Sequence, residues 1–96
     1  MAAFLIATTT VKDAEKFKRY AEQVVKTFAL YGGEPLLRGN FEGMLGGEGH
    51  HQMAGVVKFP SIEALRTWFY SPEYQSIIPL RTEAVDMSIA TYSVPD

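Results

Sequence analysis

The chain has 96 residues, of which 47% are hydrophobic and 21% are charged, and its formal net charge at pH 7 is −2. This length predicts one domain spanning residues 1–96, and the composition excludes a disordered chain. The small negative charge disfavours nucleic acid and anionic membranes as partners, and the absence of cysteine excludes disulfides and thiol nucleophiles. The apolar stretch Met1 to Ala7 is too short to span a bilayer, so we expect a soluble cytoplasmic protein.

The first part of the chain predicts a strand, a helix and a second strand. Residues 3–11 are β-branched and apolar without a helical period, which is typical of a strand. Asp13 is a candidate N-cap for a helix that Gly32 and Gly33 end, because glycine accepts the positive φ of a helix C-terminus. Residues 34–40 predict the second strand. The apolar positions of the helix form one stripe: Phe17, Tyr20, Ala21, Val24, Val25 and Phe28.

The second part of the chain begins with a glycine-rich stretch at residues 39–52, which predicts a flexible hairpin loop. Residues 53–59 predict the third strand. Ser61 is a candidate N-cap for a second helix, and the pair Ser71-Pro72 predicts that this helix restarts. We expect Pro79 to kink or break it before residues 80–85. Residues 86–94 alternate and predict the last strand.

The order β-α-β-β-α-β predicts a ferredoxin-like α+β fold, a four-stranded antiparallel sheet with two helices on one face. Two helices cover one face, yet the first and third strands carry apolar side chains on both. We expect a homodimer in which two sheets pack face to face, because a bare apolar face of several hundred Å² is more than monomers tolerate. The alternation predicts two apolar sets: Phe4, Ile6, Met53, Val57 and Phe59 on one face, and Leu5, Ala7, Ala54 and Val56 on the other.

Three motifs carry a resemblance to a known family: YGGEPLLRG at 31–39, FPSIEAL at 59–65 and WFYSPEYQ at 68–75. In this order they resemble the family called domain of unknown function 1330, of the dimeric α+β barrel superfamily. The resemblance covers essentially the whole chain and implies the same fold and sheet-to-sheet dimer. The superfamily includes cofactor-free monooxygenases, a lactone isomerase, haem-binding chlorite-degrading enzymes and stress-responsive proteins, whereas the family has no agreed reaction. Asn40 stands where the family usually has a further glycine.

Two arginines are candidate ligand clamps. Arg38 lies in a strand otherwise made of leucines, beside Gly39, and could hold a carboxylate or enolate in a pocket between helices and sheet. The alternative is an ion pair with Glu34 or Glu42. Arg81 has the same two interpretations, a clamp or a solvated helix charge.

Three aromatic residues are candidates for the wall of the same pocket. Trp68 and Tyr74 flank the join between two helical pieces, and each combines apolar area with one hydrogen-bonding group. Tyr20 faces inward from the first helix and could donate to a bound oxygen. The alternative for all three is ordinary core packing.

His50 and His51 are the two histidines of the chain, and therefore the side chains whose ordinary pKa suits acid-base chemistry near neutrality. Adjacent side chains in an extended segment point to opposite sides, so we expect that these two do not share a metal. The sequence predicts an exposed loop here and no metal site. The glycines match no phosphate-binding pattern.

Two hypotheses follow. In the first, the dimer binds a small acidic or phenolic molecule between helices and sheet, without an organic cofactor, and has oxygenase or isomerase activity by analogy with the superfamily. Its predicted ligand-binding residues are Tyr20, Arg38, Trp68, Tyr74 and Arg81. In the second, the dimer is a non-catalytic binding or stress-response module. Convergence of Arg38 with a tyrosine hydroxyl would favour the first hypothesis, whereas a surface ion pair of Arg38 and a filled pocket would favour the second.

Overall fold

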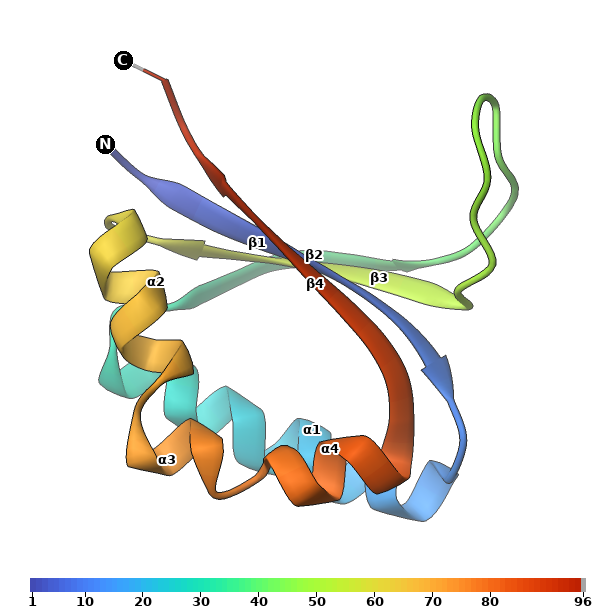
Figure 1. The fold of residues 1–96 in the computed structure, drawn as a ribbon, viewed down its shortest axis with the longest axis horizontal. Helices are drawn as coiled ribbons and strands as arrows, with labels where there is room; N and C mark the ends of the chain where they lie inside the picture. The colour runs from blue at the N-terminus through green and yellow to red at the C-terminus, as the bar shows by residue number, and fades with distance from the viewer. Residues whose placement is uncertain (96) are drawn as a thin grey trace.

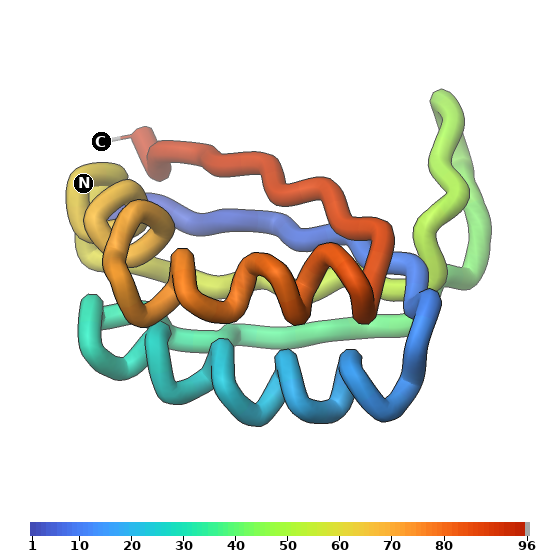
Figure 2. Tube along the Cα trace, turned by 60° about the horizontal axis from the view of Figure 1, so that its bottom comes forward, coloured from blue at the N-terminus to red at the C-terminus, as the bar shows by residue number. Residues whose placement is uncertain are grey.

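A computed structural model describes residues 1–95, with four strands and four helices. The strands form one antiparallel sheet in the order β2-β3-β1-β4, and the helices lie on one side of it (Figures 1 and 2). The ferredoxin-like α+β fold is therefore confirmed. Within residues 1–95, no helix is long and apolar enough to cross a membrane. The elements are β1 (Ala3–Val11), α1 (Ala14–Leu30), β2 (Glu34–Asn40), β3 (Met53–Phe59), α2 (Ile62–Phe69), α3 (Pro72–Gln75), α4 (Ile78–Ala84) and β4 (Val85–Ser93).

The second helical region is three separate helices, as the restart at Ser71-Pro72 and a break at Pro79 predicted, except that the second break comes before Pro79. Ser61 and Ser71 cap α2 and α3 as predicted, their hydroxyls accepting from Ala64 N–H at 3.0 Å and Tyr74 N–H at 3.2 Å. The chain leaves the helical path between α3 and α4, before Pro79, which sits in the first turn of α4. A proline is well tolerated there because no earlier residue of the helix would accept its missing N–H.

The two glycines after α1 have different roles. Gly32 has the predicted positive φ of +78°, whereas the φ of Gly33 lies outside the left-handed region. Gly33 is instead a point of close approach, because a Cβ built there would lie 2.8 Å from Phe59 Cζ and 3.1 Å from Phe28 Cβ. A side chain at this position would therefore collide with the core.

Replacing Gly33 by alanine should lower the free energy of unfolding by about 1–3 kcal/mol, because Phe59 is fully buried and cannot yield without strain. Gly39→Ala is the matched control, since a Cβ at Gly39 meets no atom within 4 Å. Urea denaturation followed by circular dichroism measures both. An equal stability of the two variants would contradict the close approach at Gly33.

The strand register decides which side chains face the helices. Leu5 lies opposite Val57, and Ile6 lies opposite Val56 and Ala90. Because Leu5 and Val57 belong to the core under the helices, Ile6 and Val56 must point to the other side, which we call the open face. The predicted grouping of Phe4 and Ile6 with Val57 and Phe59 was therefore wrong. Alternation within one strand shows which of its residues share a face, but not which residues of a neighbouring strand lie on that same face.

The open face is apolar over its central strands. Phe4 and Tyr92 stack on it with ring centroids 5.1 Å apart, and Ile6 and Val56 are half-buried beside them. Leu37 of β2 pairs with Val56 on this side and is 68% exposed. In the chain as described, all four helices are on the opposite side, so these apolar side chains remain in contact with water (Figure 1).

Candidate functional site

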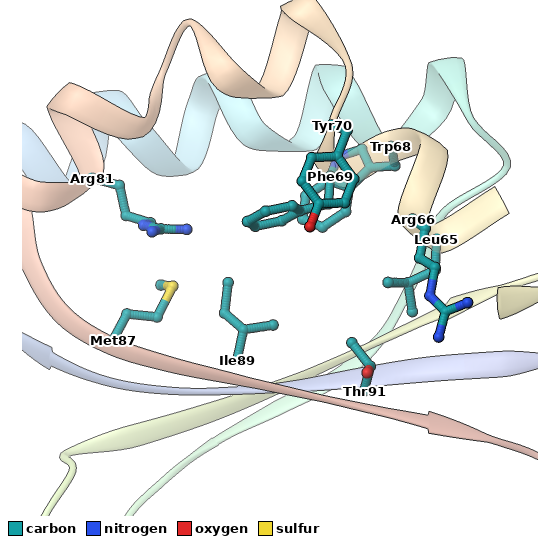
Figure 3. A pocket seen from close by; sticks show the side chains of 9 residues that line it. All are labelled: Leu65, Arg66, Trp68, Phe69, Tyr70, Arg81, Met87, Ile89 and Thr91. Atoms are coloured by element: carbon teal, nitrogen blue, oxygen red, sulfur yellow. The ribbon is translucent and has the colours of Figure 1, made fainter. Parts of the chain in front are cut away.

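A hollow of about 400 Å³ opens between α2, α4 and β4 on the helix side of the sheet (Figure 3). Its aromatic wall comes from the end of α2, and its floor comes from β4, an edge strand that leaves one side of the hollow open. The lining residues are Leu65, Arg66, Trp68, Phe69, Tyr70, Arg81, Met87, Ile89 and Thr91.

The polar and apolar groups of the hollow are segregated. Arg81 and Arg66 lie at opposite ends, with Phe69 and Tyr70 between them (Figure 3). The floor consists of alternate β4 residues, because every second side chain of a strand points to the same face. The hollow thus offers an apolar and aromatic middle between two guanidinium groups.

A chain of hydrogen bonds through two buried tyrosines holds the Arg81 side chain in place. Its guanidinium Nη1–H donates to the Tyr74 hydroxyl at 2.8 Å, and that hydroxyl is 2.9 Å from the hydroxyl of Tyr20. The Arg81 guanidinium carbon also lies 5.9 Å from the centre of the Tyr74 ring. Both tyrosines are buried, so this contact fixes one edge of the guanidinium and leaves its other N–H groups for the hollow.

Tyr20 stays a neutral phenol in this arrangement. Burial raises its pKa well above the ordinary value, and the neighbouring Tyr74 raises this pKa further, against a smaller lowering by the Arg81 charge. A neutral Tyr20 can donate or accept a hydrogen bond but does not serve as a base near pH 7. Its role is to keep the Tyr74 hydroxyl in place.

Trp68 is the inner wall of the hollow and also the centre of the core. Its side chain is 1% exposed, and its ring centroid lies 4.3 Å from that of Tyr74 and 5.1 Å from that of Phe28. The indole N–H donates to Thr27 Oγ1 at 2.9 Å, and the Thr27 hydroxyl donates in turn to the Val24 carbonyl at 2.7 Å. Trp68 is therefore rigid, with its polar atom satisfied inside the core.

The structure brings together four of the five predicted ligand-binding residues. Trp68 and Arg81 line the hollow, and Tyr20 and Tyr74 support Arg81 from the core. Arg38 is not with them: it is exposed on β2, opposite Gly55, at the other edge of the sheet from β4.

Arg38 also lacks the ion pair that was its alternative interpretation. Among residues 1–95 the ion pair within 4.0 Å joins Lys16 to Glu83, with a separation of 3.6 Å. The guanidinium that meets a tyrosine hydroxyl is that of Arg81. The expected convergence of a guanidinium with a tyrosine hydroxyl is therefore found at Arg81 of α4, the second arginine considered, and not at Arg38 of β2.

The sequence reasoning missed most of the lining. Arg66 and Tyr70 are four residues apart and so share one face of the end of α2, a signal that was available but resembles an ordinary solvated face. Met87, Ile89 and Thr91 are the helix-side positions of the last strand, which its alternation could have identified. Nothing in the sequence showed that α2 and β4 are close together.

The two histidines are arranged differently from the prediction. Their ring centroids lie 4.5 Å apart with an interplanar angle of 30°, so both side chains point the same way. The expectation of opposite sides was wrong because residues 41–52 form no strand. Asp86, from the start of β4, lies close to both rings.

The four-stranded antiparallel sheet with helices on one side places the chain among ferredoxin-like α+β proteins. The sequence model of the family described as domain of unknown function (DUF1330) matches residues 2–93, and the chain belongs to this family. A comparison with curated proteins gives no match.

Solved structures share the fold at low sequence identity. A protein of unknown function from Rhodopseudomonas palustris is 20% identical with a TM-score of 0.82, the match covering 99% of this chain and 83% of that one. SnoaB, a cofactor-independent oxygenase from Streptomyces nogalater, is 9% identical with a TM-score of 0.72 over 99% and 94% of the two chains. A dimeric ferredoxin-like protein of unknown function from Thermobifida fusca is 15% identical with a TM-score of 0.59 over 98% and 92%.

Proposed function

We propose that this protein binds a small acidic or phenolic molecule in the hollow between α2, α4 and β4. The observation that carries this proposal is the guanidinium of Arg81, which lines the hollow while the buried Tyr74 hydroxyl holds one of its N–H groups. A guanidinium fixed in this way is prepared to meet a carboxylate or phenolate, because less side-chain freedom is lost on binding.

The remaining lining suits the body of such a molecule. Phe69 and Tyr70 offer ring faces and edges, and Met87 and Ile89 offer an apolar floor. A volume of about 400 Å³ lies within the range of small-molecule sites, which is roughly 300–1,000 Å³. Arg66 at the far end favours a ligand with a second acidic or polar group.

The same lining favours binding over acid-base catalysis. Its polar side chains are arginine, tyrosine and threonine, and none of these ordinarily titrates near pH 7. A cofactor-independent oxygenation, the activity named for SnoaB, is the second candidate because that protein shares the fold. In that case the ligand would have to react as its own enolate or phenolate, with Arg81 stabilising the negative charge.

The proposal includes a homodimer that packs open face to open face. The apolar side chains of β1 and β3 on that face have no helix over them, and the structural neighbour from Thermobifida fusca is described as dimeric. A second copy can cover such a face, and two-fold homodimers are the commonest oligomers. The hollow lies on the helix side, so each subunit would keep its own.

Isothermal titration with benzoate and with phenols tests the ligand site. Arg81→Ala should weaken binding by about 10- to 100-fold, the effect of losing a charge-assisted hydrogen bond, and Arg81→Lys should recover only part of it. Arg38→Ala is the control, because it removes an exposed arginine outside the hollow. Equal affinities in all four proteins, or no binding by the wild type, would overturn the proposal.

A further inference from the structure

We propose that His50, His51 and Asp86 form a binding site for one divalent transition-metal ion. Each residue offers one ligand atom, and these atoms all lie within 4.8 Å of one another. The two histidines come from the glycine-rich loop between β2 and β3, and the carboxylate comes from the beginning of β4. This site is separate from the hollow and does not depend on a ligand bound there.

The three ligand atoms have to move by only a short distance to bind one ion, from separations of up to 4.8 Å. With metal–ligand bonds near 2.0–2.2 Å, a tetrahedral ion holds its ligand atoms about 3.3 Å apart. His50 and Asp86 are exposed, so small rotations of their side chains can bring the three atoms together without disturbing the core. The two neighbouring rings already point to one side.

Thr10 holds His51 in a suitable orientation. The His51 Nδ1 atom is 3.0 Å from Thr10 Oγ1. In the tautomer in which Nδ1–H donates to the hydroxyl, the lone pair of Nε2 is left for a metal, and such a partner orients the ligating imidazole. Thr10 is the register partner of Asp86 on β1, so one position across the two strands carries both the orienting hydroxyl and the ligating carboxylate.

The end of the loop that carries the histidines is attached to the sheet through Gln52. Its N–H donates to the Thr9 carbonyl at 2.9 Å, and its side-chain Oε1 accepts from Val11 N–H at 3.1 Å. Its own carbonyl accepts from Phe41 N–H at 2.7 Å. His51 is therefore fixed relative to β1 although the rest of the loop is exposed, which lowers the entropy lost when a metal binds.

The ligand types decide which ions fit. Two imidazoles and one carboxylate favour Zn²⁺, Co²⁺, Ni²⁺ or Cu²⁺ over Mg²⁺ and Ca²⁺, which prefer oxygen ligands throughout. Three protein ligands leave at least one position for water or another molecule. Both histidines also border a groove of about 580 Å³ on the open face, whose apolar lining includes Leu37, Met44 and Val56.

The test uses the full chain without a histidine tag, titrated with Co²⁺ by visible absorption and with Zn²⁺ by calorimetry. We expect one ion per chain, and an affinity at least about tenfold lower in His50→Ala, His51→Ala and Asp86→Asn. Glu42→Gln is the matched control, a carboxylate of the same loop outside the cluster. Circular dichroism of each metal-free variant checks that it is folded.

Two further variants separate orientation of His51 from general damage. Thr10→Val keeps the shape of the side chain but removes the hydroxyl, so it should weaken the metal affinity about tenfold or more. Thr10→Ser keeps the hydroxyl and should bind metal like the wild type. Arg81→Ala should bind metal like the wild type even where the ligand of the hollow is lost. The proposal is overturned if the wild type binds no more tightly than the double variant His50→Ala/His51→Ala, or if Asp86→Asn leaves the affinity unchanged.

Discussion

Replacing Trp68 by alanine should lower the free energy of unfolding by about 3–5 kcal/mol, the ordinary cost of removing a large aromatic side chain from a core. The ring is 1% exposed and contacts aromatic residues from three elements, Phe28 of α1, Phe59 of β3 and Tyr74 of α3. The cavity would therefore open where helices and sheet meet. Denaturation should be followed by circular dichroism, because Trp68 is the single tryptophan and its fluorescence is lost with the substitution.

A second variant of Trp68 separates its packing from its hydrogen bond, and a variant of an exposed neighbour is the control. Trp68→Phe keeps most of the ring but removes the N–H that Thr27 accepts, and should cost about 1–2 kcal/mol. Tyr70→Ala removes a neighbouring aromatic side chain that is 73% exposed, and should change stability by about 0.5 kcal/mol or less. A loss for Trp68→Ala no larger than that for Tyr70→Ala would contradict the central place of Trp68 in the core.

Replacing Ile6 by lysine should separate the proposed homodimer into monomers. Ile6 lies on a central strand of the open face, between Val56 and Ala90, so a lysine there would place an unpaired charge in the middle of two packed sheets. Such burial costs several kcal/mol, and about 3 kcal/mol already weakens association by more than 100-fold. Light scattering at micromolar concentration should show a mass that falls from about twice 10.7 kDa to 10.7 kDa.

Leu30→Lys is the control for this experiment. Leu30 is 63% exposed at the end of α1, on the helix side of the sheet, and its substitution should leave the mass unchanged. A wild-type protein that remains a folded monomer at micromolar concentration would refute the interpretation of the open face. The same holds if Ile6→Lys keeps the dimer mass.

The strands were predictable because their signals are local. Residues 3–11, 34–40 and 53–59 are observed as predicted, and β4 begins one residue earlier than expected, at Val85. Each is a short run of residues with high β-propensity, bounded by turn residues. Both the run and its boundaries can be recognised without knowing any distant part of the chain. The phase between β1 and β3 was predicted wrongly because it depends on a register between residues about fifty positions apart.

The candidate site was predictable in its chemistry but not in its membership. We expected an inward tyrosine hydroxyl beside a guanidinium, with Arg38 and Arg81 as the candidate arginines. In the structure the pair is Tyr74 and Arg81. Local spacing could not show that α4 turns Arg81 toward the end of α2. The histidine cluster was missed for the same reason, since Asp86 is 35 residues away from His51 along the chain.

The sequence by itself determined the order of strands and helices, the caps that begin α1, α2 and α3, and the presence of apolar side chains on both faces of the sheet. These properties depend on residue types within a few positions of one another. Only the tertiary structure decided that Arg81 and not Arg38 meets a tyrosine hydroxyl, and that His50, His51 and Asp86 lie together. The physical reason is that both clusters join side chains from elements that touch only after the sheet has paired and the helices have packed on it.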